Sequence, residues 1–178
     1  MTRDRLTLER AAADHRAAIA AAVADFERVA GADWERPVRP GKWSPAEIAQ
    51  HLTVSYAPAM SELAGGAGYR RRLSPLMTRM ARWIALGGIL SGRRFPSGGK
   101  SPPEARPVGP FPSPAEAAAR LRSAAEAFEK AISEAHRGGG GRITNAYFGA
   151  LSAPEALKLV AMHADHHRKQ LRERGGSS

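Results

Sequence analysis

The sequence SAPEALKLVAMHADHHRKQL, residues 152–171, carries the signals of one amphipathic helix. Ser152 and Glu155 stand three residues apart with a proline in between, the pattern that satisfies free backbone N–H groups at a helix start. Apolar residues and two histidines then recur at helical spacing on one stripe: Ala156, Leu159, Val160, His163, His167 and Leu171. We therefore predict a helix over about 153–174 that turns this stripe inward.

Three further helices are predicted from similar signals. Ser44 with Glu47, and Ser113 with Glu116, repeat the start pattern, and an alanine-rich stretch near the N-terminus has apolar residues at helical spacing. No window shows sustained alternation of apolar and polar residues, so no sheet is predicted. The expected helices span about 5–30, 45–64, 114–136 and 153–174. Four amphipathic helices with one long connection predict an all-α four-helix bundle.

Length and composition narrow the class of protein. A chain of 178 residues fits one domain, 1–178, with 67–112 as an insertion between the second and third helices and 174–178 as a flexible tail. The absence of cysteine excludes disulfides, thiolate metal sites and cysteine nucleophiles. No signal peptide or transmembrane stretch is recognisable, so we expect a cytoplasmic protein. The abundance of Ala, Arg and Gly is typical of a GC-rich bacterium.

Positive charge is concentrated in the insertion. Residues 67–112 carry nine Arg and Lys against a single Glu, or +8 of the net +10 of the chain. Three interpretations are open: a solvated flap over the mouth of the bundle, which we favour, recruitment of an anionic thiol or substrate, or contact of 76–90 with an anionic membrane. Nucleic-acid binding is disfavoured, because the segment has few aromatic residues and no known motif.

Histidines at three positions predict a metal site. His163 and His167 are separated by about 40° around a helix, so their imidazoles can converge on one ion. His51 follows Ile48 by three residues and is also expected to face inward. Three histidines on two helices would leave positions open for water or substrate, as in catalytic metal sites. The competing interpretation is that these are hydrogen-bonded core histidines without a metal.

Neighbouring polar residues have expected roles as well. Gln170 lies on the stripe of His163 and can orient a ligand imidazole from outside the coordination sphere, or be an exposed residue at the helix end. His166 is expected to flank the pair in the same supporting way. Glu47 is expected to cap its helix, and Trp43 to pack at the start of that helix. His15 and His136 are expected at the surface.

Two segments resemble the signature blocks of the DinB-like superfamily: Trp43-Ser-Pro-Ala-Glu-Ile-Ala-Gln-His51-Leu, and Tyr147-Phe-Gly-Ala-Leu-Ser with His163-Ala-Asp-His-His167-Arg-Lys-Gln170. In that family the first block ends with a ligand histidine, here His51. The second contains a histidine pair followed by glutamine, which correspond to His163, His167 and Gln170. The resemblance covers most of the chain outside the insertion and implies an up-up-down-down bundle with a divalent ion, often zinc or nickel.

The resemblance also implies a function. Better-understood members resemble thiol S-transferases that use bacillithiol, mycothiol or glutathione, and others resemble maleylpyruvate isomerases. We therefore expect a metal-dependent transferase, or a hydrolase-like enzyme, that activates a low-molecular-weight thiol for a small-molecule substrate. The alternative is a metal-binding or interaction bundle without turnover. A homodimer is a further expectation.

Overall fold

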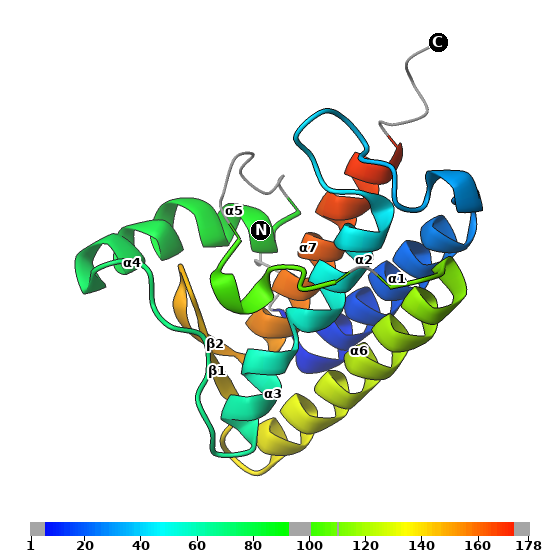
Figure 1. The fold of residues 1–178 in the computed structure, drawn as a ribbon. Coiled ribbons are helices and arrows are strands. Elements are labelled where there is room, and N and C mark those ends of the chain that lie inside the picture. The colour runs from blue at the N-terminus through cyan, green and yellow to red at the C-terminus, as the bar shows by residue number, and fades with distance from the viewer. Residues whose placement is uncertain (1–5, 93–100, 110, 173–178) are drawn as a thin grey trace.

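The computed structural model describes residues 6–92, 101–109 and 111–172, and most of them are helical (Figure 1). The long helices are α1 (Leu8–Glu27), α2 (Pro45–Val54), α6 (Pro114–Arg137) and α7 (Ala153–Arg172). α1 packs along α6 and α7, and α2 packs against α6, around one apolar core. The largest buried side chains include Phe26, Ile48, Leu121, Phe128, Ile132 and Leu157. The helical class predicted from the sequence is confirmed.

Serine and glutamate residues stand at the starts of α2, α6 and α7 as predicted, and the hydrogen bonds differ at α7. The Ser44 hydroxyl accepts from the Glu47 N–H at 3.2 Å, and the Glu47 carboxylate accepts from the Ser44 N–H at 2.7 Å. Before α7, the carboxylate of Glu155 instead accepts from both the N–H and the hydroxyl of Ser152. Glu47 therefore has the capping role that the sequence predicts.

The helix predicted over 45–64 is divided in two. α2 ends at Val54, and α3 (Ala57–Leu63) begins after a short turn. Pro58 has no N–H to donate to the carbonyl of Val54, so the helical hydrogen bonding is interrupted there. The break lets the side chain of Tyr56 enter the core, where it is 3% exposed.

A two-stranded antiparallel hairpin precedes α7, so the prediction of no sheet is wrong. Strand β1 (Arg142–Asn145) pairs with β2 (Gly149–Ser152), with Ile143 opposite Leu151. The side-chain oxygen of Asn145 accepts from the N–H groups of Tyr147 and Phe148 and closes the turn. Each strand has four residues, too few for the alternation of apolar and polar residues to be recognised in a sequence window.

The insertion contains a second helical unit. Helix α4 (Pro75–Ala81), a π-helical turn η2 (Arg82–Leu86) and α5 (Gly87–Leu90) follow one another without interruption, and α4 extends away from the long helices beside the hairpin (Figure 1). Residues 101–109, which include the 3₁₀ turn η3 (Pro103–Ala105), return across α2. The expected tail, 174–178, lies outside the described residues, as do Arg93, Arg94 and Lys100.

A 3₁₀ turn, η1 (Gly31–Asp33), follows α1. The next residue, Trp34, is 2% exposed, and its Nε1 donates to the Phe111 carbonyl at 2.7 Å. The loop before α2 and the end of the insertion are therefore joined. In the described part of the chain, no helix has the length and apolarity needed to cross a bilayer.

Candidate metal centre

Helices α2 and α7 bring the three predicted histidines together. The Nε2 atom of His163 lies 3.0 Å from Nε2 of His51 and 3.1 Å from Nε2 of His167. The ring centroids are 4.8–4.9 Å apart, and each ring presents an edge to the others. His51 and His167 are buried, and His163 is half-buried. The imidazole of His51 thus converges with those of His163 and His167, although His51 and His163 are 112 residues apart in the sequence.

Hydrogen bonds on the far side of two rings fix which nitrogen carries the proton. Nδ1 of His51 lies 2.5 Å from the carbonyl oxygen of Ala105, a pure acceptor, so this nitrogen donates. Nδ1 of His167 donates to Oε1 of Gln170 at 2.9 Å, and the Nε2 of that amide lies 3.1 Å from Nε2 of His166. In the neutral rings of His51 and His167, Nε2 therefore carries a bare lone pair directed toward His163.

Burial keeps these rings neutral. Loss of solvent, and after it the neighbouring imidazoles, lower the pKa of His167 to about 3 and the pKa of His163 well below its usual value. The pKa of His51 is also lowered, chiefly by burial, although the bond to the Ala105 carbonyl opposes the shift. Neutral imidazole is the form that binds a metal ion, so the cluster is in its ligand form at neutral pH.

The geometry fits a divalent ion. Two nitrogens at about 2.0–2.1 Å from a tetrahedral zinc are separated by about 3.4 Å. The two separations from Nε2 of His163, 3.0 and 3.1 Å, need to open only slightly, and the ligand atoms of all three residues lie within 4.8 Å of one another. Without a cation, a proton on Nε2 of His163 can satisfy only one of the two lone pairs that face it. A cation bound by all three nitrogens relieves that mismatch. Three neutral ligands would leave one or more positions open and the full charge of the ion in place.

Trp43 and the insertion enclose the cluster. The indole of Trp43 stacks at 22° on His167, with centroids 6.1 Å apart, and lies 4.7 Å from His51. Trp43 packs against the core, as predicted, and also forms a wall of the site. Residues 101–109, which we call the strap, are held to α2 by a bond from the Gly109 N–H to Gln50 Oε1 at 2.9 Å.

The sequence reasoning missed the contribution of the strap. The partner of His51 is a backbone carbonyl, and any residue at position 105 would supply one, so no side-chain signal could have revealed it. The strap is further fixed by an ion pair between Arg72 and Glu104, with N and O 3.1 Å apart. Gln170 and His166 lie beside the cluster in positions consistent with the supporting roles expected of them.

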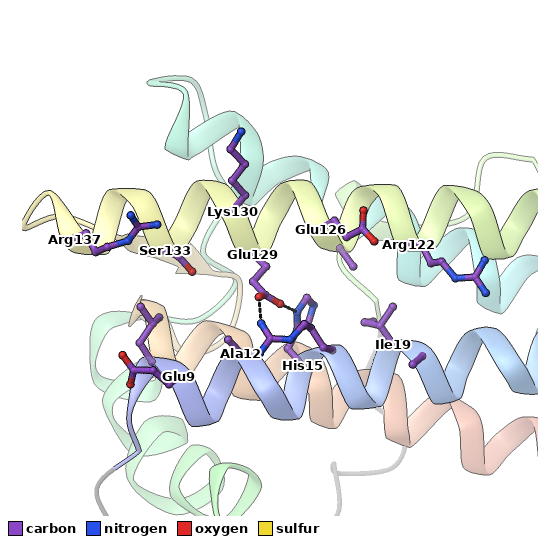
Figure 2. Close-up of a pocket in the computed structure, with 14 residues that line it drawn as sticks. Glu9, Ala12, His15, Ile19, Arg122, Glu126, Glu129, Lys130, Ser133 and Arg137 are labelled. Atoms are coloured by element: carbon purple, nitrogen blue, oxygen red, sulfur yellow. Dashed lines mark hydrogen bonds and ion pairs between the residues drawn. The ribbon is translucent and has the colours of Figure 1, made fainter.

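Another histidine, His15, is buried elsewhere, beside a groove of about 700 Å³ between α1 and α6 (Figure 2). His15 was expected at the surface but is 1% exposed, and this prediction is wrong. Its Nδ1 lies 3.1 Å from a carboxylate oxygen of Glu129, and its Nε2 lies 2.9 Å from the hydroxyl of Tyr56. Helical spacing from Ala12 and Ile19 places it on the inward stripe of α1, a signal that could have identified it.

Comparison with known protein families identifies the family of the chain. The family model of the DinB superfamily matches residues 11–171, a range that includes all three histidines of the cluster and the whole insertion. Comparisons with curated proteins and with solved structures found no match to the chain.

Proposed function

The chain belongs to the DinB superfamily, and from that premise we propose that it is a divalent-metal-dependent transferase that activates a low-molecular-weight thiol. His51, His163 and His167 are the proposed ligands, and zinc or nickel is the proposed ion, since imidazole suits both. The observation that carries the proposal is the meeting of two oriented Nε2 lone pairs at the Nε2 of His163.

The chemistry of the proposal is Lewis acidity. A divalent ion at this site, held by neutral ligands, would lower the pKa of a thiol or water and so supply a nucleophile at neutral pH. The protein contributes orientation: the Ala105 carbonyl and the Gln170 amide hold two rings with Nε2 inward. The indole of Trp43 and the strap shield the cluster from bulk water, which strengthens electrostatic interactions inside it.

Charge near the site supports an anionic thiol as the substrate. Arg106 directly follows the residue whose carbonyl holds His51, and the net charge of the insertion is +8. Guanidinium groups recognise carboxylates and phosphates through paired hydrogen bonds. The common low-molecular-weight thiols of cells carry carboxylates, so a basic rim would favour their approach and raise their local concentration.

Metal content tests the ligand assignment. We expect about one zinc or nickel per chain in protein purified without a His-tag, and loss of the metal from His51→Ala and His163→Ala. His136→Ala is the matched control, because His136 is exposed in the last turn of α6. Elemental analysis after dialysis against zinc or nickel measures all four proteins. Wild-type protein without metal, or a His163→Ala variant that retains it, would disprove the assignment.

Turnover separates the enzyme from the binding protein. Metal-loaded protein is assayed with thiols that carry carboxylates and with simple neutral thiols against a panel of small electrophiles. Transfer that requires metal, and that prefers the acidic thiols, supports the proposal. Bound metal without transfer to any electrophile favours the alternative, a metal-binding bundle without turnover.

A further inference from the structure

The helical unit of the insertion exposes an apolar surface. Among the residues that the structure describes, six large apolar side chains are exposed, and five of them lie between positions 76 and 84. We call these five the apolar stripe: Leu76 at 62% exposure, Met77 at 55%, Met80 at 51%, Trp83 at 86% and Ile84 at 65%. Their spacing places them along one face of α4 and η2. A contiguous exposed surface of this kind marks a site of interaction.

The opposite face of the same unit is anchored, so the stripe is held outward. The guanidinium of Arg82 donates to the carbonyls of Phe148 and Ala150 at 3.1 and 2.7 Å, and to Glu155 at 2.9 Å. Leu86 and Ile89 are buried, at 3% and 1% exposure. The hairpin and the start of α7 thus form a base for this helix, and the outward direction of the stripe is a property of the fold.

Positive charge accompanies the stripe. Arg79, on α4, and Arg70 and Arg71, in the segment that leads into α4, are exposed, and no acidic residue occurs between Glu62 and Glu104. Arg79 lies within about 60° of Leu76 around the helix, at the edge of the apolar face. A second copy of the chain on this face would bring two such arginine groups together, which is unfavourable. The complementary surface is apolar in its centre and negatively charged around it.

We infer that this helical unit docks the protein on the surface of a lipid bilayer that carries anionic headgroups. The apolar stripe would lie at the boundary between headgroups and acyl chains, and the three arginines would face lipid phosphates. Trp83, the most exposed of the five, is of the residue type that favours this boundary. The unit spans only Pro75–Leu90, shorter than the roughly 20 residues of a membrane-crossing helix, so it lies along the surface.

The composition of the stripe separates a bilayer from a nucleic acid. Single-stranded nucleic acids are bound by several aromatic rings on which bases stack, whereas this stripe has one aromatic ring and four aliphatic or thioether side chains. Such side chains gain free energy on transfer to hydrocarbon but have little to offer a base.

Vesicle binding tests the inference. Metal-loaded full-length protein is mixed with two kinds of vesicle, at low and at high salt. The neutral vesicles contain phosphatidylcholine alone, and the anionic vesicles also contain about 30% phosphatidylglycerol, a content chosen to supply negative headgroups. Co-sedimentation gives the partition coefficient. The variants are Trp83→Ser/Ile84→Ser, which removes apolar area, and Arg70→Gln/Arg71→Gln, which removes charge. The controls are Val108→Ser, an exposed apolar residue outside the stripe, and Lys130→Gln/Arg137→Gln, two exposed charges on α6.

We expect binding to the anionic vesicles alone, with a decrease of about fivefold for each arginine removed and of more than tenfold for the apolar variant. High salt should weaken binding, and the Val108→Ser variant should bind like wild type. The charge control on α6 should bind more tightly than Arg70→Gln/Arg71→Gln. Tryptophan emission should shift to the blue on binding in the wild type but not in Trp83→Ser/Ile84→Ser, because Trp34 is already buried and Trp43 is stacked on His167.

Three results would overturn the inference. The first is no binding to anionic vesicles at low salt. The second is binding that Trp83→Ser/Ile84→Ser leaves unchanged, because the stripe would then have no part in it. The third is a stable dimer in sedimentation that this variant dissociates, which would make the stripe an interface between two copies. Every substituted side chain is exposed, whereas the histidines are buried or half-buried, so unchanged metal content in every variant keeps this test separate from that of the metal site.

Discussion

Two groups of buried histidines in this molecule differ in what their nitrogens face. Both ring nitrogens of His15 face oxygens, a carboxylate of Glu129 and the hydroxyl of Tyr56. In the cluster of His51, His163 and His167, the Nε2 atoms face one another. The first arrangement is complete with protons alone, because a donor meets an acceptor at each contact. In the second, one proton on Nε2 of His163 can satisfy only one of the two lone pairs that face it, and a bound cation would satisfy both.

Burial does not distinguish the two groups. Loss of solvent is the largest cause of the lowered pKa of His15, as it is for His163 and His167. A search for perturbed histidines would therefore rate both groups alike. The chemistry of the partners separates them: His15 joins α1 to α6 and to the turn after α2, whereas the three histidines of the cluster are placed where they could hold a metal ion.

Removal of the His15 side chain should produce the largest change in stability. We expect His15→Ala to lower the free energy of unfolding by about 2–4 kcal/mol, because it leaves a cavity and strands the Tyr56 hydroxyl. Metal content should stay at the wild-type level. Urea denaturation and elemental analysis measure the two quantities, with His136→Ala as the exposed control, expected within about 0.5 kcal/mol of wild type. A loss of metal in His15→Ala would show that the two groups act as one unit.

Replacement of Gln170 should change metal affinity strongly and stability little, the reverse of what is expected for His15→Ala. Gln170→Leu removes the acceptor of the His167 N–H, and we expect metal affinity to fall by about 10–100-fold, a typical effect of losing such an orienting partner. The free energy of unfolding of the metal-free protein should change by less than about 1 kcal/mol, since Gln170 lies near the end of α7. Competition with a metal-binding dye measures the affinity. If the metal affinity of Gln170→Leu equals that of the wild type, Gln170 does not support the metal site.

Acid should destabilise the protein partly through His15. The folded state lowers the pKa of this ring, so the unfolded chain binds a proton more readily. The stabilising contribution is complete above the unfolded pKa near 6.5 and is lost as the pH falls below it, at up to about 1.4 kcal/mol per pH unit.

The variant His15→Gln isolates this contribution. With a chelator present, the unfolding free energy of wild-type protein should fall more steeply between pH 6.5 and 5.5 than that of His15→Gln. The histidines of the cluster also have lowered pKa values and contribute to the acid sensitivity of both proteins, so the difference between them belongs to His15. Equal slopes in urea titrations would show that His15 accepts its proton equally well when folded.

The position of the cluster could be predicted because helices relate sequence to geometry in a simple way. A separation of four residues puts His163 and His167 on one face of α7, and a separation of three from the buried Ile48 puts His51 inside. The start patterns at Ser44 and Ser113 fixed where two helices begin, to within a residue. These are local rules, and they hold wherever a long helix forms.

The features that escaped prediction depend on contacts that are distant in sequence. The hairpin before α7 has strands too short to show a pattern, and its turn depends on the side chain of Asn145. The position of His15 on the inward stripe was readable, but its partners on α6 and after α2 were not. The outward face of α4 and η2 depends on Arg82, whose acceptors lie 66 to 73 residues away.

The bond between the strap and His51 has a consequence for how this protein can change over evolution. It requires the main chain to pass at one place, and the side chain of residue 105 takes no part in it, although Ala105 is itself buried and a larger residue there would have to be accommodated. Neighbouring positions such as Arg106 and Val108 can therefore be exchanged while the imidazole keeps its orientation. The orientation of His51 is thus set by the course of the main chain, and substitutions at the exposed positions of the strap can alter the surface around the cluster without moving its histidines.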